Sequence, residues 1–344
     1  MPSLRSKSPF TANWLRAWRI YHVNVMSGAL PMIDFSAFGD DSAASRARRA
    51  AIAGEIGAAC RETGFFALTG HGIDATMIDD AFAMAQNFFD LPEDKKREIA
   101  IERSPCHRGW FAHGGEVLDR TKQPQGDYKE GLKIGRDLPP DHASVKAALP
   151  LHGANQYPHE SGALVGFRKH MDTLYGACEA LSRHLMQAFA LSLDLPPDHF
   201  DRWLSEPMAT LSPLRYPPMQ KAAELSAGAH SDFGCLTLLF QHDVAGLEIK
   251  TKKGWQDVPL LDGAIIVNIG DMMEHWTGGL YASTVHRVVN RSQTTRHSMA
   301  YFFDPDPDAD LTPLPNCGAS AAAPLSALEH LLNKIDASFD YRSD

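Results

Sequence analysis

The sequence predicts a mainly β protein with α-helices, in which a jelly roll of short antiparallel strands is wrapped by the helices that precede it. Two features of the apolar pattern support this fold class. Between residues 41 and 195, apolar side chains recur three and four positions apart, as on one face of a helix. From residue 209 on, they form short strand-like runs separated by Gly, Pro and Asp. Many short strands joined by turns are typical of a sandwich or a jelly roll.

The N-terminal half is expected to supply most of the helices. The first helix ends before Gly64, a residue type that is common at helix ends. Residues 106–115 are rich in Gly, His and aromatic residues, and residues 138–158 are rich in Pro, His and Gly, so both segments are expected to be loops. The expected elements, in order, are a strand at 30–35, a helix at 41–63, a strand at 64–68, a helix at 74–89, a helix from Pro92, and a long helix at 161–195.

The C-terminal half is expected to hold the jelly roll. The run Asp304-Pro-Asp-Pro-Asp ends its last strand, because proline has no N–H to donate to a sheet. Strands are expected at 209–216, 235–241, 246–250, 255–258, 264–269, 284–289 and 298–303, and a terminal helix at 325–335. We therefore expect one compact domain made of an extension at 1–27, a wrap of helices and strands at 28–207, the jelly-roll core at 208–304, and a tail and helix at 305–344.

The composition is that of an ordinary globular protein and argues against several classes of function. Of the 344 residues, 44% are hydrophobic and 22% are charged, and the net charge is −9. A chain this negative is not expected to bind nucleic acid or an anionic membrane. The five cysteines are scattered and odd in number, which favours free thiols in the cytoplasm. The composition does not indicate an oligomeric state.

Three His-x-Asp triplets occur, at 170–172, 199–201 and 230–232, and only the third is placed to hold a metal ion. On an extended segment, side chains at i and i+2 point to the same side, so a His and an Asp can reach one ion. The first triplet lies in the long helix, where such side chains diverge. The second lies in the first turn of a short helix. His230 and Asp232 are therefore the candidate metal ligands.

A third ligand and a carboxylate clamp follow along the chain. His286 lies 54 positions after Asp232 in a strand-like run, and Arg296 lies ten positions further on, two before Ser298. Two His and one carboxylate leave three positions of an octahedron open, which is the ligand set of non-haem Fe(II) oxygenases. A guanidinium beside a hydroxyl suits a carboxylate. The pattern fits a dicarboxylate that chelates iron at one end and is held at the other.

This spacing resembles that of the 2-oxoglutarate/Fe(II) dioxygenase superfamily, in particular its isopenicillin N synthase-like branch. The resemblance covers about residues 30 to 304 and rests on a combination of motifs, at 30–34, 64–73, 214–217, 246–249, 268–271 and 281–287. It implies a double-stranded β-helix, the jelly roll of this superfamily. It also implies Fe(II) as cofactor, 2-oxoglutarate and dioxygen as cosubstrates, and ascorbate as a candidate reductant.

The resemblance further assigns roles to residues. Arg296 and Ser298 are expected to hold the distal carboxylate of 2-oxoglutarate, and Tyr216 to add a hydroxyl to it. The implied reaction is the oxidation of a small molecule by hydroxylation, desaturation or ring closure. The loop at 106–115 falls where this branch has a substrate lid. The candidates for contact with the substrate are His107, Arg108, Trp110, Phe111, Thr210 and Phe233.

Three other functions stay open on the sequence alone. Isopenicillin N synthase itself cyclises a tripeptide without 2-oxoglutarate. Against that activity, His107 and Phe111 stand where its lid has Arg and Tyr, Thr210 stands where it has Ser, and no Gln follows Gln293 to act as its tail ligand. A zinc hydrolase is the second alternative, because two His and an Asp also suit Zn²⁺, although no general-base Glu is evident. A jelly roll that binds without catalysis is the third.

Overall fold

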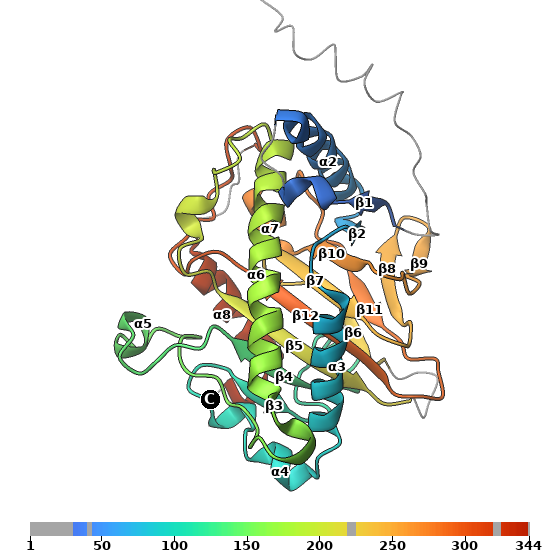
Figure 1. The fold of residues 1–344 in the computed structure, drawn as a ribbon, viewed down its shortest axis with the longest axis vertical. Helices are drawn as coiled ribbons and strands as arrows, with labels where there is room; N and C mark the ends of the chain where they lie inside the picture. The colour runs from blue at the N-terminus through green and yellow to red at the C-terminus, as the bar shows by residue number, and fades with distance from the viewer. Residues whose placement is uncertain (1–29, 40–42, 219–224, 319–324, 343–344) are drawn as a thin grey trace, which may run out of the picture.

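Two β-sheets enclose the interior of the molecule and helices cover one of them (Figure 1). The computed structural model describes residues 30–39, 43–218, 225–318 and 325–342, so the extension expected at 1–27 lies outside it. The strands are β1 (Met32–Asp34), β2 (Phe65–Thr69), β3 (Gly109–Phe111), β4 (Glu130–Gly135), β5 (Ala209–Tyr216), β6 (Ala227–His230), β7 (Leu236–Gln241), β8 (Leu247–Thr251), β9 (Gly254–Asp257), β10 (Ile265–Ile269), β11 (His286–Val288) and β12 (Arg296–Phe303). The α-helices are α2 (Ala43–Glu62), α3 (Ala75–Phe89), α4 (Glu93–Arg97), α5 (Ala143–Lys146), α6 (Phe167–Ser192), α7 (Asp271–Trp276) and α8 (Ala327–Ser338).

The larger sheet draws strands from both halves of the chain. Its eight strands run in the order β1-β2-β10-β7-β12-β5-β4-β3, and the smaller sheet has the order β6-β11-β8-β9. The segments at 28–207 and 208–304 therefore share one sheet. The model corrects the expected loop at 106–115, which contains β3 paired with β4. Neither strand stands out in the sequence, because β3 has three residues and β4 carries two glycines and two charged side chains.

The helices α2, α3 and α6 pack on the outer face of the large sheet, and α6 runs along this face (Figure 1). One side of α6 buries Met171, Leu174, Leu185 and other apolar side chains. Each buried side chain of this size stabilises the fold by roughly 1.5–3 kcal/mol. The helix begins at Phe167 rather than at residue 161, because Gly166 has a φ of 87° that a right-handed helix does not accept.

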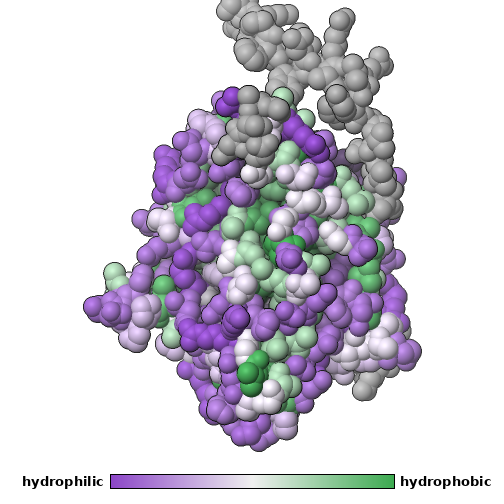
Figure 2. All heavy atoms as spheres, in the orientation of Figure 1, coloured by the Kyte–Doolittle hydropathy of each residue, from purple (hydrophilic) through white to green (hydrophobic). Residues whose placement is uncertain are grey.

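The inner face of the large sheet is the one that positions polar groups. Alternate residues of a strand point to opposite faces, so Thr210, Ser212, Leu214 and Tyr216 of β5 all point inward, where they line the space between the sheets. Helix α8 closes one end of this space with apolar side chains. The helical face of the molecule is mostly hydrophilic, with smaller apolar patches (Figure 2). None of the helices in the described ranges is long and apolar enough to cross a membrane.

Candidate active site

The three predicted metal ligands converge at the edge of the small sheet. His230 is the last residue of β6 and His286 the first of β11, and the two residues are directly paired in the antiparallel ladder. Asp232 follows two positions after His230. Its Oδ1 lies 3.7 Å from His230 Nε2 and 3.5 Å from His286 Nε2. One ligand atom from each of the three residues falls within 4.8 Å of the others, so a single ion can touch all three.

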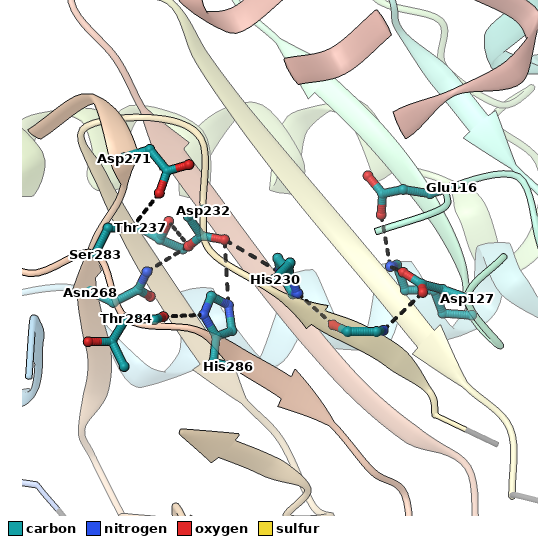
Figure 3. A network of polar contacts seen from close by, with 12 residues as sticks. Glu116, Asp127, His230, Asp232, Thr237, Asn268, Asp271, Ser283, Thr284 and His286 are labelled. Carbon is teal, nitrogen blue, oxygen red and sulfur yellow. Dashed lines mark hydrogen bonds and ion pairs between the residues drawn. The ribbon is translucent and has the colours of Figure 1, made fainter. Parts of the chain in front are cut away.

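Hydrogen bonds orient each ligand toward that point (Figure 3). Nδ1 of His230 lies 2.8 Å from the carbonyl oxygen of Gly228, and Nδ1 of His286 lies 3.2 Å from that of Thr284. A carbonyl can only accept, so each Nδ1 carries the proton and each Nε2 keeps its lone pair for a metal. Oδ2 of Asp232 accepts hydrogen bonds from Thr237 at 2.5 Å and Asn268 at 2.6 Å. Oδ1 is the oxygen left to face the imidazoles.

The protonation states suit a divalent cation. Burial, with a further contribution from His286, lowers the pKa of His230 to about 4, so this imidazole is neutral at pH 7. Burial alone would raise the pKa of Asp232, but the two imidazoles and the hydrogen bonds from Thr237 and Asn268 outweigh it and lower that pKa. Two imidazoles and one carboxylate on one side of an ion form the facial triad of non-haem Fe(II) sites. The donor set therefore fits Fe(II).

Arg296 is a buried cation without a carboxylate partner. Its side chain is 0% exposed, and no ion pair joins it to any residue that the structure describes. Nη1 donates to Ser298 Oγ at 3.2 Å and Nη2 to Gln241 Oε1 at 3.4 Å, while Nε is buried with no partner in the described ranges. Its guanidinium carbon lies 4.8 Å from the ring centre of Tyr216. A guanidinium so placed is poised to bind an anion from solution.

A second buried network reaches His230 from the other side (Figure 3). Lys129 forms ion pairs with Asp127 and with Glu116, the latter at 2.9 Å. Asp127 in turn accepts a hydrogen bond of 2.9 Å from the N–H of Gly228, whose carbonyl holds His230. The two ammonium groups near Glu116, chiefly that of Lys129, outweigh its burial and hold its pKa far below the usual range. Glu116 is therefore charged at neutral pH.

The candidate metal ligands, Arg296 and the network of Lys129 all border a cavity of about 170 Å³ between the sheets. Its walls include the three candidate ligands on one side and Arg296 with Ser298 on the other. Helix α8 and the residue after it contribute an apolar wall of Leu331, Ile335 and Phe339. The cavity thus brings together the candidate metal ligands, the buried guanidinium of Arg296 and an apolar side.

Comparison with known proteins assigns the family. A model described as the 2OG-Fe(II) oxygenase superfamily matches residues 208–305, and one described as the N-terminal part of non-haem dioxygenases in morphine synthesis matches residues 30–160. The chain belongs to the 2OG-Fe(II) oxygenase superfamily. The fold class, the enzyme class and the cofactors predicted from the sequence are confirmed: it is an oxygenase that uses Fe(II) and 2-oxoglutarate.

The relatives of this oxygenase carry matching names. The 2-oxoglutarate-dependent dioxygenase citB of Monascus ruber is 34% identical, with 91% of this chain and 96% of that protein covered. The 2-oxoglutarate-Fe(II) type oxidoreductase hxnY of Emericella nidulans is 33% identical, covering 86% and 85%. The crystal structure of a full-length Neurospora crassa protein in complex with alpha-KG and thymine superimposes with a TM-score of 0.77 at 27% identity, covering 91% and 98%.

Only some of the predicted substrate-contact residues of this oxygenase line the cavity. The cavity is lined by His107, Arg108, Thr210 and Phe233. Phe111 lies behind this lining, with its ring over Gly131. Trp110 is corrected to a core position, because its indole N–H donates to Glu130 at 2.8 Å and its ring packs in the main core. On β3 its neighbours point inward and Trp110 points outward, which could be read only once the strand was known.

The sequence did not indicate that the buried charged residues Glu116, Lys129 and Lys133 line the cavity. The available signal was the alternation in Lys129-Glu-Gly-Leu-Lys-Ile-Gly135, where polar or glycine positions recur every second residue. With β4 recognised, both lysines would fall on one face. No general-base Glu is evident beside the metal ligands in the sequence, whereas Glu116 borders the same cavity in the structure.

Proposed function

We propose that this 2OG-Fe(II) oxygenase holds its iron with His230, Asp232 and His286. The observation that carries the proposal is that their free ligand atoms meet within 4.8 Å while every other polar atom of the three side chains is already hydrogen-bonded. Fe(II) bound there would supply the redox chemistry that couples decarboxylation of 2-oxoglutarate to oxidation of the substrate. The protein orients the three ligands through the hydrogen bonds that their other polar atoms make.

We assign the distal carboxylate of 2-oxoglutarate to Arg296 and Ser298. Support comes from the guanidinium, which is buried, forms no ion pair with a described residue although Asp243 attracts it from further away, and lines the same cavity as the metal ligands. Burying a cation costs several kcal/mol unless an anion accompanies it. Tyr216 packs against the guanidinium and has its hydroxyl as a further donor. These residues bind and orient the cosubstrate and exclude water around it.

The substrate is proposed to be a small molecule that is hydroxylated, desaturated or cyclised. Crystal structures of the similar Neurospora crassa protein contain thymine or 5-formyluracil, which are small molecules, and the cavity here is of modest size. A cytoplasmic location is proposed from the five cysteines, all of which are buried free thiols.

Anaerobic titration with 2-oxoglutarate tests these assignments. The Fe(II)-loaded protein should develop the weak visible charge-transfer band of an iron-bound keto acid, and Arg296→Ala should require about 100-fold more 2-oxoglutarate because two charge-assisted hydrogen bonds are lost. Arg168→Ala, which removes a half-exposed arginine of α6, is the matched control and should leave the titration unchanged.

Three results would contradict the proposal. Equal half-saturation in Arg296→Ala and the parent would remove the clamp assignment. Iron binding without a keto-acid band would favour an oxidase that needs no 2-oxoglutarate. Binding of Zn(II) but not Fe(II) would favour the hydrolytic alternative.

A further inference from the structure

A row of three inward-facing positions crosses the large sheet beside the metal ligands. Strand β4 pairs with β5 so that Ile134 lies opposite Leu211 and Gly131 opposite Leu214. The same register sets Lys133 opposite Ser212. On the other side of Ser212, β12 contributes Ala300. All three members of the row line the cavity. Directly opposed side chains on one face lie about 5 Å apart at Cβ, so the ammonium and the hydroxyl are neighbours.

Both polar members of the row have hydrogen-bonding capacity to spare. Ser212 is 0% exposed, and its Oγ has no hydrogen-bond partner in the described residues. A buried hydroxyl without a partner is unfavourable, because it has lost its hydrogen bonds to water. Lys133 Nζ has three protons, but the structure gives it one hydrogen bond, a long one of 3.4 Å to Glu116. Lys133 and Ser212 can therefore donate hydrogen bonds to a bound ligand.

The charges around Lys133 indicate which group would accept them. Asp127, Lys129, Glu116 and Lys133 form a chain of alternating charge. Both carboxylates of the chain are satisfied by Lys129, with ion pairs shorter than the 3.4 Å contact to Lys133. Glu116, Lys129 and Lys133 line the cavity and Asp127 does not, so the part of the chain that faces the cavity carries one net positive charge. A cationic ligand is disfavoured at this position, and an anionic one is attracted.

The surroundings of the ammonium are aromatic. Lys133 Nζ lies 5.5 Å from the ring centre of Phe111, 5.4 Å from that of Phe302 and 6.0 Å from that of Phe339. Leu331 and Ile335 of α8 extend this apolar wall. Rings at this distance stabilise the cation and leave apolar area for the body of a ligand. The corner thus combines one charged donor, one hydroxyl and a large apolar surface.

We propose that Lys133 and Ser212 bind the carboxylate of the substrate, which is a small apolar carboxylic acid. This inference rests on the proposed function, because it takes the cavity beside His230 as the substrate site. The acid group would lie between the ammonium and the hydroxyl, and the hydrocarbon body of the substrate would pack against Phe302 and Phe339, which line the cavity. The site is separate from the Arg296 corner, where the second carboxylate of the reaction, that of 2-oxoglutarate, is held.

Calorimetric titration with acids and their amides tests the inference. The probes are phenylacetate, 3-phenylpropionate, 4-phenylbutyrate and hexanoate, each beside its primary amide, added anaerobically to the protein loaded with Fe(II) and 2-oxoglutarate. An acid and its amide have nearly the same shape, so their difference in affinity reports the charge. We expect at least one acid to bind about tenfold or more tightly than its amide, as one charge-assisted contact provides.

Variants of Lys133 and Ser212 show whether these residues cause the preference for the acid over its amide. Lys133→Met keeps the length of the side chain and should abolish the preference for the acid while leaving amide binding unchanged. Ser212→Ala, which removes only a hydroxyl, should weaken acid binding about threefold. Lys95→Met, which removes a surface ammonium, is the control and should bind like the parent.

Two outcomes overturn the inference: no acid of the panel binds better than its amide, or Lys133→Met keeps the preference. The keto-acid band is recorded on the same samples. Because that band involves Arg296 and not Lys133, its absence would count against the proposed function, whereas its presence without an acid preference would count against this inference alone.

Discussion

Two buried cations face the same cavity and differ in what accompanies them. Lys129 has two carboxylate partners, Asp127 and Glu116, within the protein. Arg296 has none among the described residues and donates only to neutral oxygens. Both side chains are almost fully buried, at 2% for Lys129 and 0% for Arg296. The same desolvation cost is therefore offset within the fold in one case and left for a ligand in the other.

This difference indicates that Lys129 stabilises the folded site, whereas Arg296 binds a ligand. Lys129 neutralises carboxylates of which one, Asp127, positions the segment that carries His230. Arg296 contributes a charge that the free protein does not use. Removal of Lys129 should therefore damage the fold, and removal of Arg296 should damage ligand binding without damaging the fold.

The largest effect on stability is expected from Lys129→Met. This change leaves two buried carboxylates without their shared cation, and loss of one partner from a buried pair typically costs about 3–5 kcal/mol. Denaturant unfolding at pH 7 would measure it. A loss below about 1 kcal/mol would show that the two cations do not differ in the way described.

The pH dependence of this variant sharpens the test. In the parent, the pKa of Glu116 is lowered in the folded state, because the two ammonium groups outweigh its burial, so its contribution to stability is lost as the pH falls below the unfolded value. Without Lys129, the buried carboxylates should have raised pKa values and take up protons on folding. The variant should therefore gain more stability between pH 7 and pH 5 than the parent, in which burial raises the pKa of Asp127 but not that of Glu116.

A smaller effect is expected on iron binding from Asp127→Ala. The N–H of Gly228 loses its acceptor, and the carbonyl of the same residue, which fixes His230, is held less firmly. Changes in groups that orient a metal ligand cost about 10- to 100-fold in affinity, and we expect the lower end because Asp127 acts through the backbone. Anaerobic Fe(II) titration would measure this. Asp127→Asn keeps an acceptor oxygen and should restore most of the affinity; equal loss in both variants would rule out this positioning role.

The sequence revealed the metal corner because its signal is local. His230 and Asp232 share one short segment, and the distances to His286, Arg296 and Ser298 follow a family pattern. Strand alternation then suffices to place Arg296 and Ser298 on one face. The helices α2, α3 and α6 were also recognisable, because long apolar periodicity is a strong signal.

The pair of Lys133 and Ser212 could not be predicted from the sequence, because it depends on the pairing of strands that are far apart along the chain. Lys133 meets Ser212 only through the register of β4 with β5, almost eighty residues apart in sequence. Gly131 and Gly135, which obscure β4 as a strand, are small because Phe111 and Arg108 lie over them. Such constraints belong to the folded chain and leave no regular period in the sequence.

Thermal unfolding of Arg296→Met, with and without 2-oxoglutarate, tests the central claim most directly. The Fe(II)-loaded protein would be compared with the parent under anaerobic conditions. We predict that the variant unfolds at the same or a higher temperature without 2-oxoglutarate, because a buried charge without a countercharge has been removed, and that 2-oxoglutarate no longer raises its unfolding temperature as it does in the parent. A variant that unfolds several degrees lower without the ligand, or that is stabilised by 2-oxoglutarate as much as the parent, would contradict the account.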